Sequence, residues 1–278
     1  MNATTSLVDI IDEKLKNDEI ELPVFDNVAM RVYKAVNEDT DDDINTILQE
    51  DPVLVGEVLR VANSSFYSGL AVVKTLQDAV VRLGRKQIAS LVMAASQKRI
   101  YSASQPRFEN RLVKLWRHSS AAAHASGWLA RKAGYRDQAE EAFLAGLIHD
   151  VGKVSLLRII EDLVTQEGAN FEMSDEVIEM TLSQLHVQHG AKLLEKWNLP
   201  DVFREVVLQQ ETEEYDETNI LLHVVRLVDR ACAKEGVSDM PDTGFCLETS
   251  TEAHNLGLDE IQLAELQMVI EDAANVSP

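Results

Sequence analysis

Cysteine is scarce in this chain of 278 residues. The two cysteines, Cys232 and Cys246, are too few for a disulfide framework, and the chain has no CxxC pair that would indicate a zinc site. A reducing compartment fits this composition best. We expect both cysteines to be small packing residues.

Long apolar runs are also missing. No run approaches the roughly 18 consecutive apolar residues that a membrane-spanning helix needs. Residues 1–5 are polar and lead into an acidic amphipathic stretch, which differs from a secretory signal. From these absences we expect a cytoplasmic protein that does not associate with membranes.

Positive charge is in short supply. The chain has 26 lysines and arginines against 47 aspartates and glutamates, which gives a formal net charge of −21. Such a surface repels phosphate backbones and anionic lipids, so extended nucleic-acid binding and membrane-surface binding are disfavoured. A small local basic pocket is still compatible with this charge.

Glycine and proline are sparse, with 12 and 6 residues, and strictly alternating strand patterns are hard to find. Apolar residues recur at helical spacing along nearly the whole chain, which predicts an all-α, multi-helical bundle. Asp51-Pro52 and Ser174 are typical helix starts, and Gly84 is a typical stop. The longest predicted helix covers about residues 108–133, and the next one begins near residue 137 and carries His149.

The polar, proline-containing residues 102–106 are the best candidate for a joint between two parts of the chain. We predict an N-terminal helical part over residues 1–105 and a helical bundle over residues 106–234. Residues 235–278 are predicted to form a loop and a helix that pack on the bundle.

The most informative segment is residues 145–153, where His149 and Asp150 end the apolar run 143–148. Burying a neutral imidazole beside a carboxylate is costly unless something compensates, and a metal ion is one efficient compensation. Gly152 allows close approach to the backbone, and Lys153 lies one helical turn from Asp150. His149, Asp150 and Lys153 are therefore candidate catalytic residues. Lys153 suits a phosphate contact, although an exposed helix lysine is the alternative.

Further ligand types occur on neighbouring predicted helices. His118 and Asp229 each lie within an apolar helical segment, and helices of a bundle can direct such side chains to one point. Together with His149 and Asp150 they would suit a single divalent metal, namely manganese, iron, zinc or nickel, with positions left for water. The alternative for Asp229 is pairing with Arg226 or Arg230.

At this point the chain resembles the HD-type metal-dependent phosphohydrolases, in the order His118, His149-Asp150, Asp229, and the HDOD subgroup in particular. The resemblance covers roughly residues 13–234. The phrases that carry it are Leu22-Pro23, Asp51-Pro52-Val53-Leu54, residues 59–67, residues 79–84, residues 115–119, residues 143–153 and residues 189–200. It implies an HD/HDOD-like bundle with an N-terminal helical subdomain and a bacterial regulatory role in second-messenger signalling, motility or stress output. In this subgroup enzymatic activity is usually undemonstrated, and metal ligands are commonly degraded.

The chain departs from the pattern of the related catalytic HD-GYP enzymes. Those enzymes are expected to carry a His-His pair where this chain has Gln209 and Gln210, and glutamine is a poor metal ligand beside imidazole. A GYP-like loop is absent from the matching region, which argues against a two-metal centre. His186 and His189 share a helix face and either could approach the His149 site. The alternative is that one packs internally and the other faces solvent.

Three functions remain open from the sequence. The first is a regulatory, signal-transducing protein, non-catalytic or weakly catalytic, that acts through protein partners and responds to a nucleotide, phosphate or metal. The second is a single-metal phosphohydrolase acting on a nucleotide or phosphomonoester. The third is an adaptor in which the His-Asp pair is a hydrogen-bonded remnant. The sequence lacks a receiver, kinase or cyclase-like segment, so we expect the input signal to come from a partner or a separate chain.

Overall fold

The computed structural model describes residues 7–16, 23, 25–38, 43–64, 66–67, 72–167, 174–238 and 240–276. These residues are predominantly helical and contain no strand, which confirms the predicted all-α class. None of the described helices combines the length and apolar character that crossing a bilayer requires. The helices are α1 (Leu7–Lys16), α2 (Asn27–Asn37), α3 (Ile44–Leu48), α4 (Pro52–Ala62), α5 (Leu76–Leu83), α6 (Arg85–Gln97), α7 (Pro106–Lys132), α8 (Ala139–Ile148), α9 (Val151–Glu167), α10 (Asp175–Lys196), α11 (Asp201–Gln209), α12 (Ile220–Lys234), α13 (Thr251–Asn255) and α14 (Glu260–Val276).

Capping side chains explain several of these bounds. Asp51 accepts hydrogen bonds from the backbone N–H groups of Val53 and Leu54 at the start of α4, and Ser174 accepts one from Val177 at the start of α10. Each cap satisfies a backbone donor that has no partner inside its helix. The helix starts predicted at Asp51 and Ser174 are therefore confirmed.

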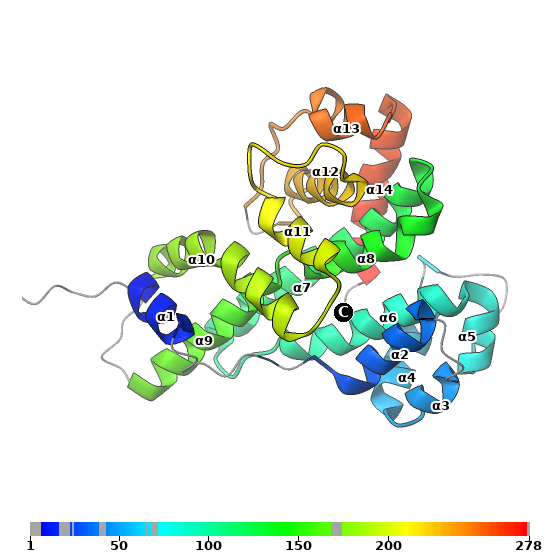
Figure 1. Ribbon diagram of the computed structural model, residues 1–278, viewed down its shortest axis with the longest axis horizontal. Helices are drawn as coiled ribbons and strands as arrows, with labels where there is room; N and C mark the ends of the chain where they lie inside the picture. Colours follow the sequence, from blue (N-terminus) through cyan, green and yellow to red (C-terminus); the bar gives the residue numbers. More distant parts are fainter. Residues whose placement is uncertain are drawn as a thin grey trace, which may run out of the picture.

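Helices α2, α4 and α5 gather around α6, and α8, α12 and α14 gather around α7 (Figure 1). Helix α6 packs against α2, α4 and α5 on one side and against α8 on the other. The 27-residue α7 runs along α8, α12 and α14, while α9 packs on α10. Helix α1 packs on α10 instead of joining α2–α6, although it precedes them in the chain. A division of the chain at residue 105 stays a prediction.

Two glycines allow unusually close helix contacts near the centre of the bundle. A Cβ atom on Gly146 of α8 would lie 2.6 Å from the carbonyl oxygen of Ala122 on α7, and a Cβ on Gly152 of α9 would lie 2.0 Å from the carbonyl oxygen of His186 on α10. Real Cβ atoms do not approach backbone oxygen this closely, so only glycine fits at either position. These crossings bring α8 against α7, and α9 against α10, within one turn of His149 and Asp150.

The predicted helix that carries His149 is interrupted. Helix α8 ends at Ile148 and α9 begins at Val151, with His149 and Asp150 in a turn between them. Adjacent residues in a continuous helix point in different directions, so they cannot both face one point. The interruption between the two helices lets the side chains of His149 and Asp150 point toward the same part of the core. It also leaves the His149 carbonyl oxygen available to accept a hydrogen bond from Nε2 of Gln210 at 3.0 Å.

Candidate metal centre

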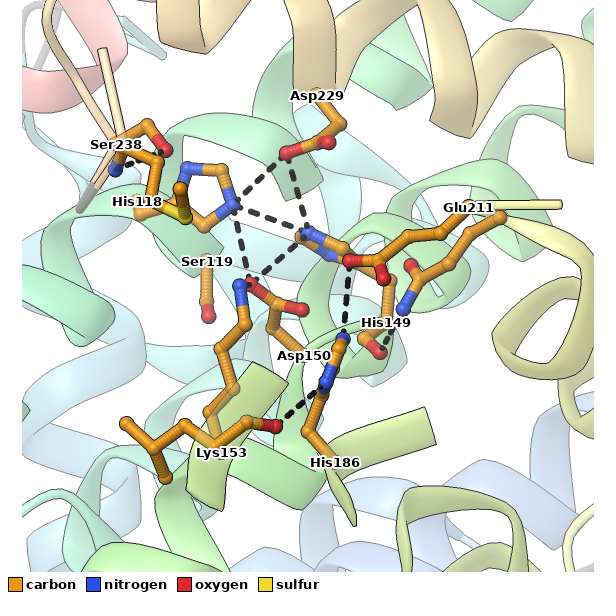
Figure 2. Close-up of polar contacts among 12 residues, drawn as sticks. His118, Ser119, His149, Asp150, Lys153, His186, Glu211, Asp229 and Ser238 are labelled. Atoms are coloured by element: carbon orange, nitrogen blue, oxygen red, sulfur yellow. Dashed lines mark hydrogen bonds and ion pairs between the residues drawn. The ribbon is translucent and has the colours of Figure 1, made fainter. Parts of the chain in front are cut away.

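The imidazoles of His118 and His149 face each other in the core, with 3.0 Å between their Nε2 atoms (Figure 2). Their side chains are each only 1% exposed. The Nδ1 atoms lie 2.8 Å from the carbonyl oxygens of Val237 and Gly146, respectively. A carbonyl oxygen only accepts, so each Nδ1 carries the hydrogen, and in the neutral ring each Nε2 presents its lone pair to the other. Facing lone pairs need a cation or a proton between them.

Two carboxylates join this pair of rings. Oδ1 of Asp229 lies 3.3 Å from Nε2 of His118 and 3.7 Å from Nε2 of His149. Oδ2 of Asp150 lies 3.7 Å from both nitrogens. Possible ligand atoms of His118, His149 and Asp150 all lie within 4.8 Å of one another. Asp150 is 3% exposed, whereas the Asp229 side chain is 44% exposed, so the cluster meets solvent on the α12 side.

Both carboxylates are held in the ionised form. Burial raises the pKa of Asp150, but the charges of Lys153, His149 and His118 outweigh burial and hold this pKa well below its usual range. Burial also raises the pKa of Asp229, but hydrogen bonds with His118 and His149 outweigh burial. The net effect is a pKa well below the usual range. The cluster therefore offers two negative charges at neutral pH. Nζ of Lys153 lies 2.8 Å from Oδ2 of Asp150 and offsets one of them.

The pKa of His118 also reflects this arrangement. Burial lowers it, yet hydrogen bonds with Asp229 and Cys232 raise it well above its ordinary value. A proton on His118 and a metal ion would occupy the same place, between two nitrogens and two carboxylates, so they compete. Burial raises the pKa of the Cys232 thiol, which disfavours a thiolate ligand.

The four residues fit a divalent metal. Two imidazole nitrogens and two carboxylate oxygens form a donor set of intermediate hardness, which suits manganese, iron, zinc or nickel. The outer N–H of each ring is fixed by a backbone carbonyl, and metal-binding histidines are usually oriented in this way. The facing Nε2 atoms can be satisfied by a metal ion or by a proton on His118, and these two states compete for one place.

The sequence model of one protein family, the HDOD domain, matches residues 22–213 of this chain. The chain belongs to the HDOD family. This family assignment confirms the resemblance that the sequence phrases indicated. The curated relative that the chain matches is an uncharacterized protein of Treponema pallidum (strain Nichols), 22% identical over 204 residues, and the match covers 71% of this chain and 38% of that protein. The chain thus spans well under half the length of this relative.

Solved structures of related proteins share the fold. An HDOD domain protein with unknown function from Geobacter sulfurreducens superposes with a TM-score of 0.75 at 20% identity, over 96% of each chain. A protein from Shewanella amazonensis SB2B, described as a candidate metal-dependent phosphohydrolase, gives 0.71 at 20% identity over 96% of this chain and 98% of its own. A candidate signal transduction protein from Marinobacter aquaeolei VT8 gives 0.66 at 21% identity over 99% of this chain and 67% of its own. At these identities the likeness shows the HDOD fold alone.

The four predicted ligand residues are brought together, but two details of the prediction are wrong. Arg226 and Arg230 do not pair with Asp229, because both reach Glu252, at 2.8 and 3.4 Å. Lys153 is not an exposed helix lysine, since its side chain is 15% exposed and paired with Asp150.

Neither His186 nor His189 faces solvent, so that alternative is wrong for both. Nε2 of His186 lies 3.0 Å from Oε1 of Glu211, and Nε2 of His189 lies 2.9 Å from Oγ of Ser155. Burial lowers the pKa of His186, but the hydrogen bond with Glu211 and the charges of Asp150 and Glu211 together raise it more, so the net shift is upward. Burial lowers the pKa of His189 to about 4, which keeps that ring neutral.

The contacts of Glu211 with His186 and of Gln210 with the His149 carbonyl were not predicted from the sequence. Glu211 lies in an acidic stretch that predicts a solvated loop, and nothing in that stretch distinguishes it from its neighbours. Arg226 of α12 fixes this segment, because its Nη1 donates to the carbonyl oxygens of Gln209, Gln210 and Thr212, each at 2.9 Å. This buried arginine therefore holds the end of α11 so that Gln210 lies against His149 and Glu211 against His186.

Proposed function

We propose that this HDOD protein is a bacterial signal-transduction protein that holds a single divalent metal with His118, His149, Asp150 and Asp229. Its output is contact with protein partners in the cytoplasm, and its turnover of substrate is weak or absent. The observation that carries the proposal is the 3.0 Å approach of two buried Nε2 atoms with both Nδ1 hydrogens fixed outward.

A divalent ion in such a centre supplies Lewis acidity toward phosphoryl oxygen and water. The chain itself orients the donors through the Val237 and Gly146 carbonyls and excludes water by burying three of the four side chains. Lys153 partly neutralises Asp150 and stands beside the cluster as a compact positive charge.

Weak or absent turnover is supported by what the two glutamines do. The side-chain amide of Gln210 donates a hydrogen bond to the His149 carbonyl oxygen. Oε1 of Gln209 accepts one from the backbone N–H of Asp216 at 2.9 Å. Both side chains therefore have structural partners at the place where catalytic HD-GYP relatives are expected to carry a His-His pair. A second metal has no imidazole donors from this segment.

The alternative is a single-metal phosphohydrolase acting on a nucleotide or phosphomonoester. It is favoured by Lys153, whose ammonium lies 2.8 Å from Oδ2 of Asp150 and so stands next to the cluster. In this proposal His149 and Asp150 hold the metal, and Lys153 contacts the phosphate of the substrate.

Elemental analysis of protein purified without added metal tests the centre. Close to one ion per chain is expected in the wild type, with near-complete loss in His118→Ala and His149→Ala. His189→Ala is the matched control, because His189 is equally buried and bonds only Ser155 among the described residues. Equal metal content in His149→Ala and the wild type would overturn the metal centre, and a metal-free wild type insensitive to chelator would favour the adaptor with a hydrogen-bonded remnant.

Turnover is tested separately with bis(p-nitrophenyl) phosphate and p-nitrophenyl phosphate in the presence of Mn²⁺. The signalling function predicts background rates for the wild type and for Lys153→Met. Robust hydrolysis that disappears in both His149→Ala and Lys153→Met, with folding retained, would instead establish the phosphohydrolase.

A further inference from the structure

A second feature of the bundle, a cleft beside the metal centre, has no role in the function proposed above. It encloses about 610 Å³ between α7, α10 and the segment that follows α12. Pockets of this size typically bind small organic ligands. We call it the α7 cleft, and its cationic rim consists of Arg107, Arg111, Lys114 and Arg117.

The cations of the rim follow the helical repeat. Arg107, Arg111 and Lys114 are spaced four and three residues apart, which puts them on one face of α7. His118 continues the same row one turn after Lys114. With a rise of 1.5 Å per residue, the row is about 16 Å long and ends at the metal centre.

The charge of the cleft is opposite to that of the chain. Four cations line it against two carboxylates, Asp175 and Glu179, in a protein whose net charge is −21. Arg107 and Arg111 already pair with these carboxylates. Lys114 and Arg117 form no ion pair with any carboxylate in the described part of the chain. They are therefore the positive charges available to a ligand.

The floor of the cleft is apolar and adjoins the site. It is formed by Leu115, Leu157 and Leu182. Each lies three or four residues along the same helix from a residue of the site, namely His118, Lys153 and His186. The opposite wall includes Val237, whose carbonyl oxygen fixes Nδ1 of His118, and Ser238, which lies beside His118 in Figure 2.

We propose that the α7 cleft binds a nucleotide that carries at least two phosphates. Its phosphates contact Lys114 and Arg117, and its base and sugar lie against the leucine floor. An apolar floor with a cationic rim suits an anion that has one apolar end, and the enclosed volume together with the acidic surface excludes a nucleic-acid strand. The cleft's role as the ligand site of the metal centre rests on the proposed function, whereas its affinity for the nucleotide does not.

Calorimetric titration of the full chain with ADP, pyrophosphate, inorganic phosphate and adenosine tests this proposal. Binding should be tightest for ADP, weaker for pyrophosphate, and weakest for phosphate and adenosine. The double variant Lys114→Glu/Arg117→Glu should weaken ADP binding at least about tenfold, because it replaces two charge-assisted contacts with repulsion. Arg85→Glu/Lys86→Glu is the matched control, since it makes the same charge change on two exposed residues of α6 outside the cleft.

The outcomes separate the cleft from the metal centre. The double variant should keep the metal content of the wild type, and His149→Ala should keep ADP binding within about threefold if the cleft contacts dominate. Absence of ADP binding, or ADP binding equally strong in the double variant and the wild type, overturns the cleft whatever the metal content. Equal affinity for phosphate and ADP would contradict the proposal that the ligand is a nucleotide, and the cleft would then be a simple phosphate site. ADP binding without any bound metal would retain the cleft and reject the proposed metal-centred function.

Discussion

Helices α2–α6 and helices α7–α12 bury different kinds of polar side chain. The described part of α2–α6 buries only neutral ones, and its ion pairs lie at the surface, as with Arg31 and Glu50, whose side chains are 45% and 48% exposed. The buried titratable side chains of α7–α12 are His118, His124, His149, Asp150, Glu161, His186, His189, His223, Arg226 and Cys232. Burying titratable groups costs free energy unless they are paired. The difference indicates that α7–α12 holds the titratable side chains whose burial costs free energy, while α2–α6 packs as an ordinary helical layer.

The largest expected effect comes from breaking a buried ion pair. Nε of Arg226 donates to Oε1 of Glu252 at 2.8 Å, with the side chains 4% and 1% exposed. Arg226→Met should lower the free energy of unfolding by about 3–5 kcal/mol, because it leaves a buried carboxylate without its main partner. Arg31→Met, its counterpart in α2, should cost at most about 1 kcal/mol. Urea unfolding measures both, and similar losses would remove the contrast between the regions.

The same pair predicts a pH dependence. Burial raises the pKa of Glu252, but the hydrogen bond from Arg226, a backbone hydrogen bond and the charges of Arg230 and Arg226 together lower it more, so the folded value lies below the ordinary value of 4.5. Such a group stabilises the fold above about pH 4.5, and the contribution is lost as the pH falls through the lower folded value. Thermal unfolding between pH 7 and pH 3 should show a smaller acid-induced loss in Glu252→Gln than in the wild type. A parallel decline in both would contradict this assignment.

Metal binding should slow hydrogen exchange more in α7–α12 than in α2–α6. At one hundred times the dissociation constant, a ligand specific for the folded state adds about 2.7 kcal/mol to its stability. Exchange measured with and without Mn²⁺ should slow most in α7, in α12 and in the turn between α8 and α9, which carry the proposed donors, and little in α2–α6. The control is His149→Ala, in which the metal should change no protection. Equal slowing throughout the chain would mean that both regions unfold as one unit.

Glycine substitutions compare the packing of the two regions. Gly152→Ala places a Cβ 2.0 Å from the His186 carbonyl oxygen, and overpacking of this kind typically costs about 1–3 kcal/mol. Gly56→Ala in α4 meets nothing within 4 Å, so it should raise stability by about 0.5–1 kcal/mol. Midpoints of chemical unfolding report both signs. A neutral Gly152→Ala would show that α9 and α10 can separate without cost.

The smallest effect is expected at the surface of the α2–α6 layer. Val81 of α5 is 77% exposed, so Val81→Thr should change the free energy of unfolding by less than about 0.5 kcal/mol. The measurement is again urea unfolding. A loss above about 1 kcal/mol, which is roughly the effect of burying one methyl group, would show that this side chain is covered in solution.

Much of the fold follows from local sequence signals. Asp51 and Ser174 cap helices where the sequence predicts, because a cap needs only a side chain and the next few backbone N–H groups. The interruption at His149 and Asp150 was not predicted, since it depends on contacts of α8 with α7 and of α9 with α10. Glycines 146 and 152 do hint at these contacts, but the sequence does not say which helices they face.

The sequence analysis named the candidate metal donors, but it missed the residues that hold neighbouring side chains in place. His118, His149, Asp150 and Asp229 are chemically distinctive residues within apolar segments, so they stand out in a sequence. Glu211, by contrast, is one acidic residue among several. Its contact with His186 depends on Arg226, 15 residues later, which ties down the end of α11. Such long-range supports carry no local pattern.

The partial exposure of Asp229 has a consequence for the kinetics of metal exchange. Three donors are sealed in the core, and only this side chain, 44% exposed, stands at the solvent boundary. In the proposed metal centre, an ion arriving from solution would meet Asp229 first and leave past it last. The buried imidazoles would then set how tightly the ion is held, while Asp229 would govern how quickly it is captured and released.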